Sequence, residues 1–145
     1  MERGAPPFAR PYASTFRQGA LNDAVASYVA SLSEDSGRKI NFEIDSRFNW
    51  QSLSQQKAYE AYRIIQEATA NAVKHSSTGD IVVSLSHTGN GYVVAKVVNF
   101  INADEPHLSD GVGVETMHRR ANTIGAEFEI RTDNRLLSVT LTFKS

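Results

Sequence analysis

Residues 62–76 read YRIIQEATANAVKHS, and this stretch decides the fold. Successive residues on a helix are about 100° apart, so residues three or four positions apart share a face. One face of the predicted helix, roughly 80° wide, gathers polar side chains: Arg63, Glu67, Asn71 and Lys74, with His75 at its margin. The opposite face suits packing against a sheet: Ala61, Ile65, Ala68, Thr69 and Ala72. The stretch therefore predicts an amphipathic helix with an organised polar row.

The polar row has the chemistry of a metal and phosphate site. Mg²⁺ prefers oxygen ligands and keeps several waters when it binds phosphate. Asn71 can offer an amide oxygen without adding charge, Glu67 can orient a group or accept a proton, and Lys74 can contact phosphate. Any one of these residues alone fits a solvated helix face equally well. The whole spacing, Glu-x-x-x-Asn-x-x-Lys-His, favours a site.

A second candidate element is Gly111-Val112-Gly113, which precedes a helix predicted over residues 114–124. Glycines allow close backbone approach to an anion, and a helix N-terminus presents free N–H groups. A pair of glycines alone is also typical of an ordinary turn between a loop and a helix. Met117 has the spacing of a core residue.

These two motifs resemble the N-box and the G2 box of the GHKL (Bergerat-fold) ATPases. The N-box likeness rests on Arg63–Ala68 and Asn71–His75, and the G2-box likeness on Gly111, Gly113, Met117, Arg120, Ala121 and Gly125. The chain is most similar to the catalytic and ATP-binding domain of NarL/DesK-type sensor histidine kinases, and the resemblance covers about Leu21 to Phe143.

The remaining periodicity predicts an α+β fold. Helical spacing covers residues 16–35 with Gly37 as a stop, and Ser52 with Gln55 resembles a capping box for the central helix. Strands are expected at 39–45, 81–87, 92–99, 127–132 and 137–143, with turns at 88–91 and Asp133-Asn134 and a loop at 100–110. The resemblance implies a two-layer α/β sandwich with a mixed, mostly antiparallel sheet and helices on one face. It would span residues 16–145, and residues 1–15 read as a linker or disordered terminus.

The composition favours some classes of protein and excludes others. The 145 residues, 41% hydrophobic and 21% charged, suit one globular domain. A net charge of −1 predicts no general affinity for nucleic acid or an anionic membrane. The chain has no cysteine for disulfides or thiolate sites, no apolar run long enough to span a membrane and no signal-peptide core at its start. We expect a cytoplasmic domain, and a longer parent protein could still carry a membrane anchor.

The resemblance implies a histidine protein kinase domain that binds ATP and Mg²⁺. Asn71 would hold the metal, Glu67 would orient the acceptor or act as base, and the phosphates would contact Lys74, His75, Gly111, Val112 and Gly113. The γ-phosphoryl group would pass to a histidine on a separate dimerisation domain, because none of the four histidines here lies in an acceptor-like pair. The implied partner, besides the dimerisation domain, is a cognate response regulator. The resemblance also implies that the parent protein is a homodimer.

The adenine side of the family pattern is altered. Asn99 stands where the family's G1 box has aspartate, and Ile101 and Ala103 stand where it has glycines. Leu136-Leu137 replaces a Gly-Thr pair near the last strand. The alternative is a degenerate GHKL module that has lost or altered nucleotide binding and works through protein contacts. Serine-directed anti-sigma-factor kinases share the fold, and Lys74-His75 argues against that class.

Overall fold

The computed structural model describes residues 20–76, 79–101 and 112–145. Its elements, in chain order, are α2 (Leu21–Ser36), β1 (Ile40–Ile44), η1 (Trp50–Ser52), α3 (Gln55–His75), β2 (Ile81–His87), β3 (Tyr92–Phe100), α4 (Val112–Thr123), β4 (Glu127–Asp133) and β5 (Leu136–Lys144). The expectations for residues 1–15, Ala103, Gly111 and most of the 100–110 loop lie outside the described residues.

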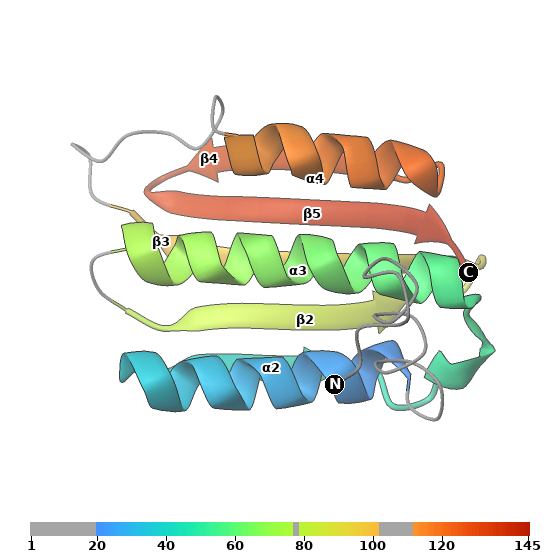
Figure 1. Cartoon of the computed structure of the whole chain (residues 1–145), viewed down its shortest axis with the longest axis horizontal. Helices are drawn as coiled ribbons and strands as arrows, with labels where there is room; N and C mark the ends of the chain where they lie inside the picture. The colour runs from blue at the N-terminus through green and yellow to red at the C-terminus, as the bar shows by residue number, and fades with distance from the viewer. Residues whose placement is uncertain (1–19, 77–78, 102–111) are drawn as a thin grey trace, which may run out of the picture.

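The architecture is the predicted α+β sandwich. Five strands form one sheet in the order β1-β2-β3-β5-β4. β1 and β2 are parallel, whereas β2–β3, β3–β5 and β4–β5 are antiparallel. Helices α2, α3 and α4 lie side by side over one face of the sheet (Figure 1). The mixed, mostly antiparallel sheet with helices on one face is therefore confirmed.

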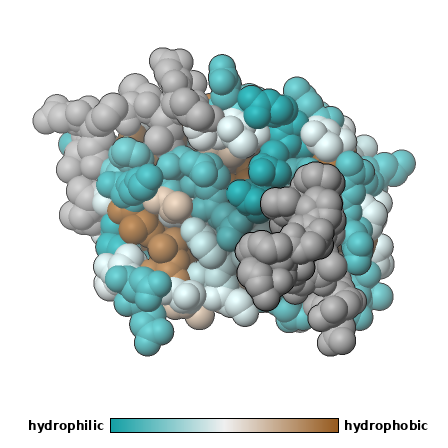
Figure 2. Space-filling model, in the orientation of Figure 1, coloured by the Kyte–Doolittle hydropathy of each residue, from teal (hydrophilic) through white to brown (hydrophobic). Residues whose placement is uncertain are grey.

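Alternation along the strands and the apolar side of α3 together build the core. Val93, Ala95 and Val97 of β3 are buried, while the residues between them are more exposed. The apolar side predicted for α3 is also buried, as Ala61, Ile65, Ala68, Thr69 and Ala72 show. The solvent side of the helix layer is largely hydrophilic (Figure 2). Each helix thus presents one apolar stripe to the sheet.

Helix α2 ends as predicted, but the start of α3 differs from the prediction. Gly37 has a left-handed φ of 73°, and its N–H donates to the Ser33 carbonyl at 3.0 Å, which closes α2. The predicted capping role of Ser52 is wrong, because Ser52 belongs to η1 and its hydroxyl donates to the Asn49 carbonyl. Ser54 is the N-cap of α3 and accepts a hydrogen bond from the Lys57 N–H at 3.2 Å.

Two further boundaries are shifted. Helix α4 begins at Val112, two residues before its predicted start, so Gly113 lies inside the first helical turn. The last hairpin turns at Asn134-Arg135, one residue later than predicted, and both residues have positive φ values of 51° and 68°. Two successive left-handed residues match the twist of a tight hairpin, and this lets Asp133 pair with Leu136.

The cap assignment predicts a difference between two nearby serines. Ser54→Ala should lower the free energy of unfolding by about 1 kcal/mol, because it leaves an N–H of the first turn of α3 without its side-chain acceptor. Ser52→Ala, the matched control, removes only a hydroxyl that donates to an exposed turn. Urea denaturation of both variants measures the difference. Equal destabilisation would contradict the assignment of Ser54 as the cap.

Candidate functional site

The predicted site elements meet at one end of the molecule. The C-terminal end of α3, the beginning of α4 and the end of β3 lie together there (Figure 1). Helices α3 and α4 run antiparallel, since Gly113 at the start of α4 lies against Glu67 while Arg120, near its end, bonds Glu60 earlier in α3. Antiparallel packing therefore places the start of α4 beside the second half of α3.

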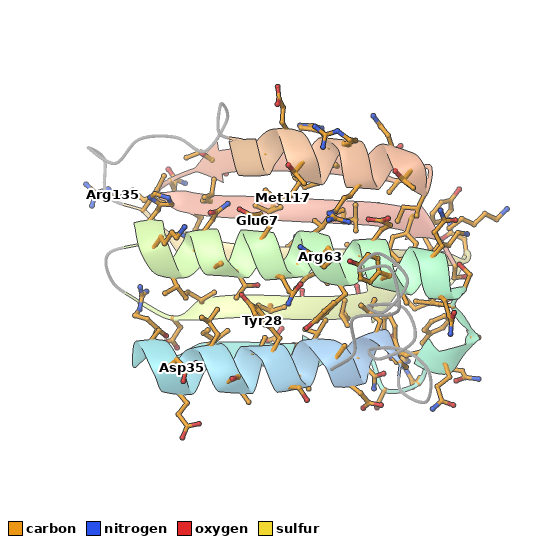
Figure 3. The ribbon with its side chains drawn as sticks, viewed as in Figure 1. Tyr28, Asp35, Arg63, Glu67, Met117 and Arg135 are labelled. Carbon is orange, nitrogen blue, oxygen red and sulfur yellow. The ribbon has the colours of Figure 1, made fainter. Side chains whose placement is uncertain are left out.

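Glu67 and Gly113 are in direct contact. A Cβ placed on Gly113 would collide with Oε2 of Glu67 and lie 3.1 Å from its Cδ, so any other residue at position 113 would make the end of the Glu67 side chain shift from this position. Figure 3 shows Glu67 on the side of α3 that faces α4, near Met117. Met117 itself is 1% exposed and belongs to the core. The carboxylate of Glu67 thus lies at the positive end of the α4 dipole.

Asn71 follows Glu67 one helical turn later. Its side chain is buried, with 8% of the residue exposed, which is unusual for a polar residue on the side of a helix. Lys74 is exposed and His75 is half-buried, and both belong to the last turn of α3. The positive charge of Lys74 in the last turn also complements the helix dipole, so this residue has a structural role independent of any ligand.

The donor set around Asn71 restricts how a metal could bind. The described part of the chain contains no group of three or more His, Cys, Asp or Glu side chains able to hold a metal ion. A neutral amide oxygen at Asn71 and the carboxylate of Glu67 nearby leave most of a coordination shell to other ligands. This arrangement fits Mg²⁺, which binds through few protein oxygens and keeps waters and phosphate oxygens.

Two positions at which the sequence departs from the family pattern, Asn99 in the G1 box and Leu137 in the Gly-Thr pair, lie side by side at the end of β3 and the start of β5. Asn99 of β3 is 3% exposed and pairs in register with Leu137 of β5, which is equally buried. The Asn99 amide donates through Nδ2 to the carbonyl of Phe100 at 3.1 Å, which leaves Oδ1 as its acceptor. Ile101 continues the strand contact, since its N–H donates to the Arg135 carbonyl at 2.9 Å.

Sequence reasoning missed an ion pair that joins α3 to α4. Arg120 donates to Oε1 of Glu60 at 2.7 Å, with the two side chains only 26% and 10% exposed. The guanidinium groups of Arg120 and Arg63 each lie 5.8 Å from the ring centre of Tyr59. Glu60 precedes Glu67 by seven residues and shares its face, so extending the polar row backwards would have found this carboxylate but not its partner.

The opposite side of α3 is fixed by tyrosines of α2 and α3. The Tyr28 hydroxyl donates to the Gln66 carbonyl at 3.2 Å, and its ring packs edge-to-face with Tyr62 at 6.4 Å. Burial raises the pKa of both Tyr28 and Tyr62 above the ordinary value of a tyrosine. Helix α3 is therefore held on both flanks.

A hollow of about 460 Å³ lies away from these residues. It is lined by residues at the β2–β3 hairpin and after β1, with the rings of Phe48 and His87 stacked 4.0 Å apart. None of the predicted site residues lines it.

No helix in the described ranges is both long and apolar enough to cross a membrane.

The sheet order, the helix layer and the contact between α3 and the start of α4 define the class of fold, that of the histidine kinase ATPase domain. Comparison with known proteins agrees. The chain is 29% identical over 126 residues to the oxygen sensor histidine kinase NreB of Staphylococcus carnosus (strain TM300). That match covers 83% of this chain and 35% of the relative. No family model matches the sequence.

Solved structures share the fold at low sequence identity. The blue-light activated histidine kinase of Erythrobacter litoralis EL346 superposes with a TM-score of 0.74 at 15% identity, covering 93% of this chain and 50% of that one. The catalytic domain of histidine kinase ThkA gives 0.65 at 12% identity, covering 87% of this chain and 94% of that domain. Full-length ShkA in complex with AMPPNP superposes with a TM-score of 0.65 at 16% identity, covering 85% of this chain and 29% of that one.

These comparisons confirm the resemblance to the GHKL domain of sensor histidine kinases. The chain spans about a third of the length of its curated relative and about half of the EL346 kinase. The similarity therefore concerns the catalytic domain.

The Glu60–Arg120 pair predicts a large loss of stability on one-sided removal. Arg120→Met should lower the free energy of unfolding by about 3 kcal/mol, because it leaves a buried carboxylate without its cation. Arg119→Met, which removes an exposed neighbouring charge, should change it by under about 0.5 kcal/mol. Denaturant unfolding compares the two, and Glu60→Leu combined with Arg120→Met should recover most of the loss. A small effect of Arg120→Met alone would show that the pair does not join the helices.

Proposed function

We propose that this chain is the ATP-binding catalytic domain of a two-component sensor histidine kinase, which binds Mg-ATP and phosphorylates a histidine on a separate dimerisation domain. The observation that carries the proposal is the contact of Glu67 with Gly113, with buried Asn71 one turn further along α3. This contact joins the N-box and the G2 box on two facing helices. Residues 16–145 would form the domain.

The proposed binding roles follow from the position of each group. The Asn71 amide oxygen would hold Mg²⁺, and the metal would supply charge neutralisation for the phosphates. Backbone N–H groups at Gly111, Val112 and Gly113 would contact the triphosphate at the start of α4, where the helix dipole favours negative charge. Lys74 would add positive charge from the end of α3, and His75 would add a hydrogen-bond donor.

Glu67 would act on the acceptor. Phosphoryl transfer depends mainly on positioning and on neutralising charge, so a carboxylate beside the reacting phosphate has one useful task. It would orient the acceptor imidazole and take the proton from one ring nitrogen while the other nitrogen bonds to the γ-phosphorus and ADP leaves. Gly113 would allow this position of the carboxylate, because its missing side chain leaves the space that the carboxylate occupies.

Asn99 would read the base. With Nδ2 already donating to the Phe100 carbonyl, the amide would present Oδ1 as an acceptor for the adenine amino group. An amide acceptor lacks the charge of the family's aspartate, and Leu137 beside it provides an apolar wall in place of a hydroxyl. We expect adenine binding to be retained with weaker hydrogen bonding than an aspartate would give.

The partners of the proposed reaction lie outside this chain. They are a histidine-bearing dimerisation domain and a cognate response regulator that receives the phosphoryl group. The parent protein would be a homodimer through that dimerisation domain.

Calorimetric titration with ATP and Mg²⁺ tests the proposal. We expect the wild-type chain to bind with micromolar affinity, and Asn71→Ala to weaken binding at least about tenfold by removing the proposed metal ligand. Glu67→Gln should keep nucleotide binding and lose phosphoryl transfer when the dimerisation domain is supplied. Thermal melting of each variant separates loss of the site from loss of the fold.

The same titration also tests the alternative, a degenerate GHKL module without nucleotide binding. A folded wild-type chain that binds no ATP would contradict the proposal and favour a GHKL module that works through protein contacts. Binding that is unchanged in Asn71→Ala would remove the metal role of that residue. Transfer that is unchanged in Glu67→Gln would remove its proposed role as base.

A further inference from the structure

Arg63 is the member of the polar row that the proposed reaction leaves without a role. It lies one turn before Glu67 on α3, and Figure 3 shows it nearer to the start of the helix. Its guanidinium turns back towards the helix N-terminus, where NH1 donates to the Tyr59 hydroxyl at 2.8 Å. Tyr59 is itself buried, so this hydrogen bond holds the arginine in one orientation.

Of the two arginines around Tyr59, one is in an ion pair with a described residue and the other is not. The guanidinium groups of Arg63 and Arg120 each lie 5.8 Å from the same tyrosine ring centre. Glu60 compensates Arg120 at 2.7 Å. Within the described parts of the chain, Arg63 makes no ion pair, and its guanidinium has five N–H donors of which the Tyr59 bond uses one. The fork geometry of the free donors matches a carboxylate.

The position of Arg63 separates it from the proposed phosphate contacts. Asn71 and Lys74 follow Glu67 along α3, and the start of α4 lies against Glu67 itself. Arg63 precedes Glu67 and lies eight residues, or about 12 Å along the helix axis, from Asn71. The Arg63 guanidinium, bonded to Tyr59 one turn earlier, therefore points away from a triphosphate bound at Asn71 and Gly113. A protein surface that brings a histidine to Glu67 would cover both residues.

We propose that Arg63 is a docking residue for the acceptor domain and binds a carboxylate on its surface near the phosphorylated histidine. This inference rests on the proposed function, since it names the chemistry of the partner at the same site. The Tyr59 hydroxyl fixes the guanidinium before the partner arrives, which reduces the conformational entropy lost on docking.

Titration of this chain with the dimerisation domain of its parent protein, without nucleotide, measures docking directly. Arg63→Gln should weaken docking about tenfold and reduce its dependence on salt, because it removes one charge-assisted contact. The docking affinity of Arg63→Lys should lie between those of the wild type and Arg63→Gln, since lysine keeps the charge and loses the fork geometry. Arg119→Gln, a charge change on the exposed side of α4, is the matched control and should dock as the wild type does.

A second titration, with Mg-ATP, separates this inference from the proposed function. Arg63→Gln should bind Mg-ATP as tightly as the wild type, and a loss of nucleotide affinity with normal docking would make Arg63 a phosphate contact and overturn the inference. Docking that is equal in the wild type and Arg63→Gln would overturn it too. Docking that depends on Arg63 in a chain that binds no nucleotide would contradict only the proposed function. Replacing the acceptor domain's carboxylates one at a time tests the same contact if Arg63→Gln does not fold.

Discussion

The packing of the Glu67 carboxylate against the backbone of Gly113 is the constraint on which the site depends. A glycine without Cβ lets the first turn of α4 approach α3 closely enough for a side chain of one helix to occupy the space beside the other. The approach brings a helix N-terminus, a carboxylate and buried Asn71 into one region. A Cβ at position 113 would displace the end of the Glu67 side chain from this region, and the sheet would remain unchanged.

Contacts on both flanks of α3 fix the position of the helix and so support the contact of Glu67 with Gly113. On one flank the Glu60–Arg120 ion pair and Tyr59 tie the first half of α3 to the end of α4. On the other flank Tyr28 of α2 bonds the Gln66 carbonyl, one residue before Glu67. Small residues on the sheet side, such as Ala68 and Ala72, bring the helix close to the strands. Positioning by packed elements suits a reaction that depends on geometry more than on covalent chemistry.

Most of the fold could be predicted from periodicity, because helix and strand spacing are local properties of the sequence. The order of elements, the Gly37 stop and the buried side of α3 were predicted in this way. The cap at Ser54 was missed because Ser52 and Ser54 both precede a glutamine-rich start, and only the three-dimensional path of η1 distinguishes them. The Glu60–Arg120 pair joins residues 60 positions apart, a distance that no local pattern encodes. The contact of Glu67 with Gly113 likewise depends on how two helices pack, although each motif could be found separately.

The most direct test of this account is phosphoryl transfer by Gly113→Ala beside its matched control, Gly89→Ala. Position 89 has open space around a Cβ, whereas a Cβ at position 113 would displace the Glu67 carboxylate. Alanine is the better helix former by about 1 kcal/mol, so Gly113→Ala should fold with little loss of stability. The account predicts at least about a hundredfold slower transfer to the dimerisation domain in Gly113→Ala alone, as expected when a catalytic group is displaced. Equal transfer rates in the two folded variants would contradict it.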